Sequence, residues 1–177
     1  MITHRLIGRR AFLGAGLAFL GAGADAHVAQ AAEVLRGPVT NLPVPRYVSM
    51  KAERGNVRRG PSQTHRVDWV FTQRNMPLRI TAEFQHWRRV QDWEGEGGWM
   101  HFSLLSGVRT VLVVEDYTPL RLLPDTQAAA RAYAEHGVIA RLGECTEQWC
   151  RISVDGRRGW VQKSALWGVA PEETRRR

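Results

Sequence analysis

Three carboxylates stand close together in the sequence, at Asp92, Glu94 and Glu96. Two carboxylates can act as general acid and general base when a rigid frame holds them in a fixed geometry. These residues alternate with Trp93 and with glycines up to Gly97, a composition typical of a flexible turn. We therefore interpret them as solvated turn charges and not as a catalytic pair.

The histidines form no catalytic motif. They are dispersed and have no adjacent nucleophile motif: His65, His86, His101 and His136. The sequence also contains no glycine-rich phosphate loop and no cluster of metal ligands. We therefore predict a non-enzymatic protein with no catalytic residues, no cofactor and no metal.

Cys145 and Cys150 are the two cysteines of the chain. An even number of cysteines suggests a disulfide in an oxidising compartment. If residues 142–145 and 149–151 form the strands of a hairpin, the two cysteines can face each other near its turn. Two thiols with no nearby histidine supply only half of the ligands that a zinc site needs. Neither thiol has a neighbouring histidine that could activate it as a nucleophile. We predict a disulfide between them.

Two stretches of the chain repeat one pattern. Trp87–Val90 is followed by Gly98–Met100, and Trp149–Ile152 is followed by Gly159–Val161, at an offset of about 62 residues. Tryptophan, glycine and a later serine recur in the same order, so duplication explains the match better than composition does. Each unit is too short for a typical catalytic domain.

Residues 1–31 have the composition of an export signal. Basic residues including Arg9 and Arg10 precede a stretch rich in alanine, glycine and leucine, which ends in a small-x-small pattern at residues 29–31. The paired arginines followed by x-Phe-Leu are typical of a twin-arginine signal. The run is glycine-rich and shorter than the roughly 20 apolar residues that span a bilayer, which makes a membrane anchor the weaker interpretation. We predict a periplasmic or secreted protein without a stable membrane span.

The charge of the exported part favours anionic partners. Removal of residues 1–31 takes away three arginines and Asp25, so the formal net charge falls from +8 to +6. Periplasmic anions include lipid headgroups, peptidoglycan carboxylates and acidic proteins, whereas nucleic acid is out of reach there. Most arginines are scattered and are interpreted as solvated surface, and residues 171–177 are expected to form a basic tail.

Short apolar runs separated by turn residues predict an all-β chain. After a proline- and glycine-containing linker at residues 32–46, we expect seven strands in the first unit: 47–50, 56–58, 67–71, 78–84, 87–91, 99–102 and 109–114. The second unit is expected to contain four strands: 120–122, 138–142, 149–154 and 160–162. The alanine-rich stretch 125–136 suggests one short helix.

Three segments of the sequence resemble those of a known domain family. Asn56-Val-Arg-Arg-Gly-Pro-Ser62, followed by Trp87–Val90 and Gly98–Met100, resembles the bacterial SH3-like (SH3b) domain family, which shares an Asn-Val-Arg-x-Gly-Pro opening and a Gly-Trp-Val closing strand. The resemblance covers about residues 47–114 as one module and 117–170 as a second, and it implies two tandem SH3-like small barrels.

The second copy departs from the family at its opening, where Leu120–Asp125 stands in place of the usual motif. A ligand site built from the opening loop is therefore expected in the first copy and not in the second. The export signal, the tandem copies and the cysteine-containing strand most resemble the SH3 subgroup of exported alphaproteobacterial proteins.

Strand alternation places Trp87 and Trp149 on the polar face of their strands, together with Arg89 and Arg151. A tryptophan outside the main core is unusual, because exposure of its large ring to water is unfavourable. One interpretation is a ligand groove, because a tryptophan at this strand start resembles the residue with which eukaryotic SH3 domains hold proline-rich peptides. The alternative is that both rings pack against a loop or the neighbouring module.

The other tryptophans separate into two kinds. Trp99 and Trp160 follow a glycine at a strand start and are expected to be architectural. Trp93, at the tip of the acidic hairpin, is expected either to touch a partner or to fold over Arg88.

The resemblance implies an exported, non-enzymatic binding or adaptor protein whose partner is peptidoglycan or a periplasmic protein or peptide. The candidate ligand-binding residues are Trp87, Trp149, Arg89, Arg151 and Trp93, with the first copy favoured. Family members often accompany cell-wall hydrolase domains, but the sequence contains none. The alternatives are a cell-envelope enzyme of unrecognised type and a purely structural envelope protein whose grooves are filled by its own chain.

Overall fold

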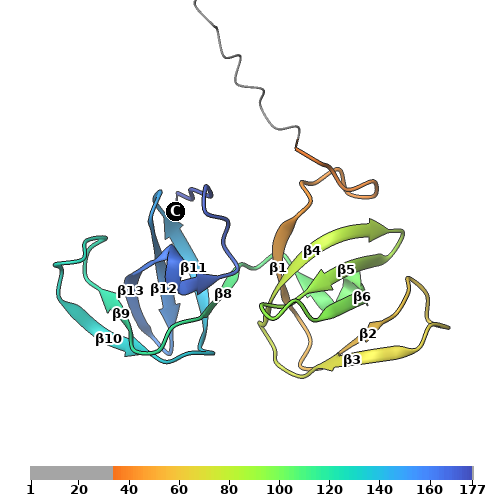
Figure 1. Ribbon diagram of the computed structural model, residues 1–177, viewed down its shortest axis with the longest axis horizontal. Helices are drawn as coiled ribbons and strands as arrows, with labels where there is room; N and C mark the ends of the chain where they lie inside the picture. Colours follow the sequence, from red (N-terminus) through yellow and green to blue (C-terminus); the bar gives the residue numbers. More distant parts are fainter. Residues whose placement is uncertain (1–33, 177) are drawn as a thin grey trace, which may run out of the picture. The chain divides into compact units, whose positions relative to one another are not determined.

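The computed structural model describes residues 34–176, whose regular secondary structure is β-strand apart from two short 3-10 helices (Figure 1). The first module contains β1 (Arg46–Met50), β2 (Gly55–Arg58), β3 (Val67–Phe71), β4 (Pro77–Phe84), β5 (Trp87–Gln91), β6 (Gly97–His101), the 3-10 helix η1 (Phe102–Leu104) and β7 (Leu105–Ser106). The second contains β8 (Thr110–Val113), β9 (Thr118–Arg121), β10 (Ala130–Ala134), β11 (Ile139–Cys145), β12 (Trp149–Val154), β13 (Arg157–Gln162), the 3-10 helix η2 (Lys163–Ala165) and β14 (Leu166–Trp167).

The two modules have the same topology, which confirms the two tandem small barrels. The first sheet has the strand order β3-β2-β6-β5-β4-β1-β7, and the second has the order β10-β9-β13-β12-β11-β8-β14. Every strand of the first sheet therefore has a counterpart seven strands later in the second. The repeated tryptophan pattern lies on the paired strands β5–β6 and β12–β13.

Each barrel closes around its own apolar core. Val57, Leu78, Ile80, Val90 and Met100 are among the buried residues of the first core. The second core is larger, and its buried residues come from every strand of the second sheet, from η2 and from the segment after β14. Alternate residues of the strands enter these cores, so the intervening residues must face outward.

A glycine lets the closing strand of each barrel approach its neighbour. A Cβ atom at Gly98 would lie 2.7 Å from the carbonyl oxygen of Arg58, and one at Gly159 would lie 2.6 Å from the carbonyl carbon of Leu120. Any side chain at these positions would push β6 away from β2 and β13 away from β9. The glycine that precedes the second tryptophan of each repeat is therefore required for closure.

The boundary between the modules lies earlier than the sequence suggested. We expected residues 109–114 in the first module, but β8 pairs with β11 and β14 of the second sheet. The first sheet ends with β7, which pairs with β1.

The helix expected at residues 125–136 is wrong. Residues 130–134 form β10, which pairs with β9 through a register shift near its start. Alanine has the highest helix propensity, but differences in propensity are small, and pairing with β9 outweighs them here.

The segment expected as an extended linker folds back on itself within its described part. Arg36 and Pro43 form an antiparallel bridge, and the N–H of Gly37 donates to the carbonyl of Leu42 at 2.8 Å. This turn is held against β4 by one acidic side chain.

That side chain is Glu83, which is fully buried at its carboxylate. The Thr40 hydroxyl donates to it at 2.6 Å, and the N–H groups of Thr40 and Val39 donate at 2.9 and 3.1 Å. Arg46 lies 2.7 Å and Arg88 3.6 Å from its Oε1 atom. Burial alone would raise the pKa of Glu83, but these donors outweigh it and lower the pKa to about 2.

Replacement of Glu83 by glutamine should lower the free energy of unfolding at pH 7 by roughly 3 kcal/mol, because Arg46 and Arg88 lose their countercharge. The folded pKa is depressed, so the wild type keeps this stabilisation above the ordinary pKa of 4.5 and loses it as the pH falls toward about 2. Urea titrations between pH 7 and pH 2 measure both effects. A variant with unchanged stability at pH 7 would contradict this role.

Cys145 and Cys150 form the predicted disulfide at the end of the β11–β12 hairpin. Both residues are buried in the second core, and the N–H and carbonyl of Cys145 also bond to the backbone of Arg175. The bridge thus ties together the hairpin and the segment that follows the barrel.

The double replacement Cys145→Ala/Cys150→Ala should destabilise the second barrel by about 2 kcal/mol or more, because it removes the closed loop and leaves space in the core. Thermal unfolding of the oxidised wild type, the reduced wild type and the variant measures the loss. Equal melting of all three proteins would show that the bridge contributes nothing.

Candidate functional site

The outer face of β12 carries the polar residues that strand alternation predicted. Cys150 and Ile152 are buried in the core, whereas Arg151 is exposed and Ser153 is partly exposed on the opposite side. In the first module, Arg89 is likewise exposed beside buried Val90.

The two repeated tryptophans lie outside both cores but are buried, each with 8% of its surface exposed. The ring of Trp87 meets the ring of His101 edge-on at a centroid distance of 5.6 Å. Trp149 lies at a hollow that Pro124, Thr174 and Arg175 also line. Both rings are therefore covered largely by their own chain.

Trp93 is 39% exposed at the tip of the β5–β6 hairpin. Its ring meets that of His136 edge-on, with the centroids 5.1 Å apart. Arg88, which we predicted as one possible neighbour of Trp93, is buried and lies beside Glu83 instead.

The register of the second sheet assembles two rows of residues on its outer face. Arg141 of β11 lies opposite Ser153 of β12, which lies opposite Arg158 of β13. In the adjacent row, Arg151 lies opposite Trp160. Residues directly opposite in an antiparallel pair share a face, so all five occupy the same side of the sheet.

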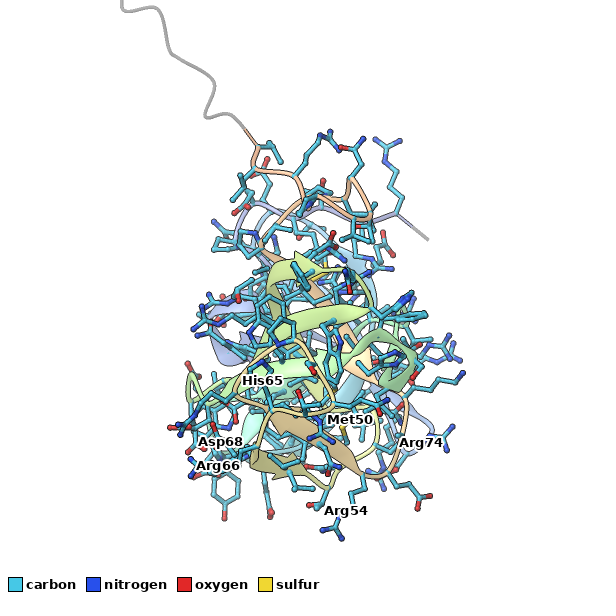
Figure 2. All side chains as sticks on the ribbon, turned by 90° about the vertical axis from the view of Figure 1, so that its right-hand side faces the viewer. Met50, Arg54, His65, Arg66, Asp68 and Arg74 are labelled. Carbon is cyan, nitrogen blue, oxygen red and sulfur yellow. A yellow bond between two sulfur atoms is a disulfide. The ribbon has the colours of Figure 1, made fainter. Side chains whose placement is uncertain are left out.

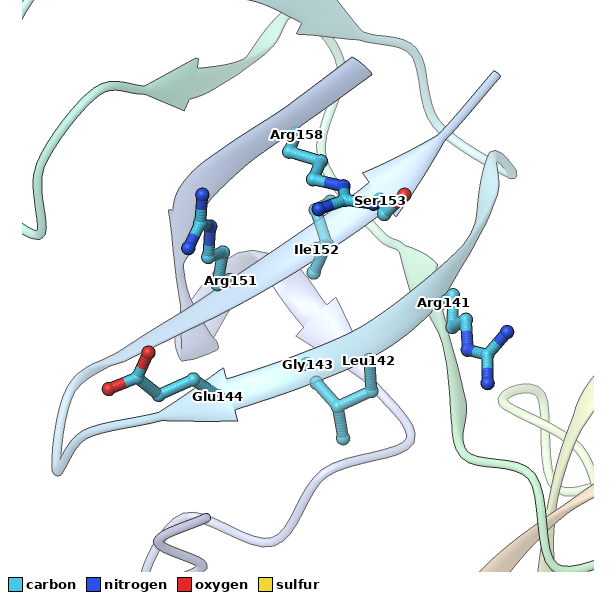
Figure 3. A pocket seen from close by; sticks show the side chains of 8 residues that line it. All are labelled: Arg141, Leu142, Gly143, Glu144, Arg151, Ile152, Ser153 and Arg158. Atoms are coloured by element: carbon cyan, nitrogen blue, oxygen red, sulfur yellow. The ribbon is translucent and has the colours of Figure 1, made fainter. Parts of the chain in front are cut away.

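Four of these residues, Arg141, Arg151, Ser153 and Arg158, line an open hollow of about 460 Å³ (Figure 3). Arg141, Arg151 and Arg158 stand on three neighbouring strands around it, and Glu144 is the one acidic residue among those that line it. Gly143 forms part of the floor without a side chain, where a Cβ atom would lie 2.9 Å from the carbonyl oxygen of Arg151. The hollow therefore carries a net positive charge.

A second hollow extends the positive surface. It shares Arg151 and Arg158 with the first and adds Arg131 and Arg157. Within residues 34–176, these four arginines and Arg141 make no side-chain hydrogen bond or salt bridge. Their guanidinium groups are free to bind an anion, and we call these five residues the arginine face.

Several arginines of the first module are instead paired within it. Arg59 and Arg66 bind the two carboxylate oxygens of Asp68 at 3.0 and 2.6 Å, and Arg66 and Asp68 are labelled in Figure 2. Hydrogen bonds from Arg66 and then Arg59 hold the pKa of Asp68 below its usual value. On the sheet, Arg79 donates to Gln91 at 3.0 Å. The corresponding face of the first module thus offers fewer free donors.

Sequence reasoning selected Arg151 but not Arg141, Arg158 or Trp160. Alternation along a single strand identified the outward face of β12, whereas the other three residues require the register between strands. The turn at Asp155 and Gly156 contained the missing signal, because it sets Ser153 opposite Arg158 and Arg151 opposite Trp160.

Comparison with protein families agrees with this architecture. A model of the bacterial SH3 domain matches residues 51–107 and 114–168, one match for each barrel. The chain belongs to the bacterial SH3 domain family. The second match begins after β8, and the first begins after β1, so the family motif is centred on the strands that carry the repeated tryptophans.

Two solved structures from Trichomonas vaginalis are similar to the chain. The structure of NlpC2 is 12% identical over 70% of this chain and 48% of its own length, with a TM-score of 0.33. The structure of NlpC1 is 11% identical over 77% of this chain and 50% of its own length, with a TM-score of 0.32. The chain spans about half the length of these structures. None of the curated proteins compared with the chain matches it.

The part of the chain from residue 34 to residue 176 contains no cluster of three or more histidine, cysteine, aspartate or glutamate side chains that could hold a metal ion. None of its helices has the length and apolar character needed to cross a membrane.

Proposed function

We propose that this protein is an exported, non-enzymatic binding or adaptor protein that recognises peptidoglycan or a periplasmic protein through the outer sheet face of its second SH3 domain. The arginine face is the observation that carries this proposal. Its free guanidinium groups stand on a rigid sheet, which suits the binding of an anionic partner.

The shape of this surface supports binding rather than catalysis. Catalytic sites are usually concave pockets with convergent polar groups of perturbed pKa. The arginine face is an open hollow on a sheet, and its arginines are not accompanied by a histidine or by a pair of carboxylates. The candidate tryptophans line neither hollow of the arginine face and are not proposed as its main contacts.

Purified full-length protein should sediment with bacterial sacculi, and the double variant Arg151→Gln/Arg158→Gln should bind at least tenfold more weakly, because charge-assisted hydrogen bonds of about 1.5–3 kcal/mol are lost. The matched control is Arg54→Gln/Arg74→Gln, which removes the same charge from two exposed loop positions of the first domain (Figure 2). Sedimentation assays over a protein concentration series measure the affinity.

A wild-type protein that stays in solution with sacculi, yet is captured by a periplasmic protein, would replace peptidoglycan by that protein as the ligand. Equal loss of binding in the control variant would show that net charge, and not the arginine face, governs the interaction.

We also propose export by the twin-arginine route. This proposal rests on Arg9 and Arg10 within residues 1–31, which lie outside the described residues. A disulfide in the second domain is consistent with an oxidising destination.

Replacement of both arginines, Arg9→Lys/Arg10→Lys, should block export and leave the uncleaved precursor in the cytoplasm, whereas Arg5→Lys should not. Cell fractionation followed by immunoblotting of precursor and processed chain measures the distribution. Normal processing of the double variant would exclude the twin-arginine route and leave general secretion.

A further inference from the structure

We infer that the arginine face binds the free carboxylates that are spaced along the short peptides of peptidoglycan, and that it does not bind the glycan strands. This inference rests on the proposed function and narrows it to one chemical feature of the polymer. It goes beyond the family match, which assigns no ligand group and no contact residue.

The spacing of the arginines sets the spacing of the anions. Arg141 and Arg158 flank Ser153 on the two neighbouring strands, and adjacent strands lie about 4.8 Å apart, so their backbones are separated by about 10 Å. Arg151 is two residues from Ser153 along β12, which is about 7 Å. An extended peptide covers these distances in about two to three residues. These backbone spacings are similar to the spacing of carboxylates two or three residues apart in an extended peptide.

The donor chemistry also selects carboxylates. A guanidinium group presents parallel N–H donors that match the two oxygens of a carboxylate, and the match gives geometric specificity as well as charge attraction. Ser153 adds a hydroxyl between Arg141 and Arg158, where it can bind a peptide amide. A neutral sugar ring would leave these guanidinium groups without a countercharge.

The composition of the face argues against two other anionic partners. The most exposed apolar residues of the second domain are Tyr117, Leu123 and Tyr133, and none of them lines the two hollows that contain Arg151 and Arg158. Tyr133 lines a separate hollow beside Arg157, at the edge of the arginine face. A membrane-binding surface inserts exposed apolar side chains beside its basic residues, and a protein interface is built around a buried apolar or aromatic centre. The aromatic residue on the same side of the sheet, Trp160, is half-buried and lines neither of these two hollows.

A strand-addition mode is also excluded on this face. β11, β12 and β13 are each paired on both sides, so they offer a partner peptide no free edge of backbone groups. Recognition must come from the side chains, which makes the charged groups of the ligand decisive.

The test compares intact sacculi with sacculi whose carboxylates have been converted to neutral methylamides by carbodiimide coupling with methylamine. The full-length wild type should bind intact sacculi and bind the amidated sacculi at least tenfold more weakly. The variant Arg151→Gln/Arg158→Gln should bind both preparations equally weakly, whereas Arg54→Gln/Arg74→Gln should behave like the wild type.

Two results would separately contradict carboxylate recognition and peptidoglycan recognition. Equal binding of the wild type to intact and amidated sacculi would overturn carboxylate recognition and leave the proposed function in place. No binding of the wild type to intact sacculi would overturn peptidoglycan recognition itself.

Discussion

The close approach of the closing strand to its neighbour is the constraint on which each barrel depends. Gly159 brings β13 against Leu120 of β9, and the next residue, Trp160, then pairs with Arg121. In the first domain Gly98 performs the same task, and Trp99 pairs with Arg58. Once this contact is fixed, antiparallel pairing sets the register of the preceding strand, and the register decides which side chains share the outer face.

The two domains preserve this frame and differ in how their arginines are used. In the first, Arg46 and Arg88 converge on the buried carboxylate of Glu83, so their charges hold the preceding turn against the sheet. In the second, Arg109 binds Glu173 and holds the following segment in a comparable way. Burial would raise the pKa of Glu173, but the hydrogen bond from Arg109 outweighs it and lowers that pKa. Within the described residues, the five arginines of the arginine face have no such partner, so their guanidinium groups are available to a ligand.

The sequence was sufficient for the fold because periodicity and duplication act locally. The bounds of β3, β5 and β12 match those expected from apolar alternation and turn residues. Alternation failed at β10, where the alanines have no strong pattern and the partner strand decides the conformation. It also could not assign β8, since membership of a sheet depends on pairing with β11, a strand far along the chain. The candidate site was recovered only in part for the same reason: Arg151 follows from its own strand, whereas Arg141 and Arg158 follow from pairing.

The buried tryptophans explain why the site lies farther along the strand than the sequence suggested. Trp149 is on the same side of β12 as Arg151, yet the segment after the barrel pairs with Cys145 and packs beside the ring. The ring therefore belongs to a second layer that covers one end of the sheet, and the uncovered part of that face begins two residues later, at Arg151. A large aromatic residue on a polar face thus marks the place where another part of the chain must cover the sheet. The residues available for recognition are those that this cover leaves open.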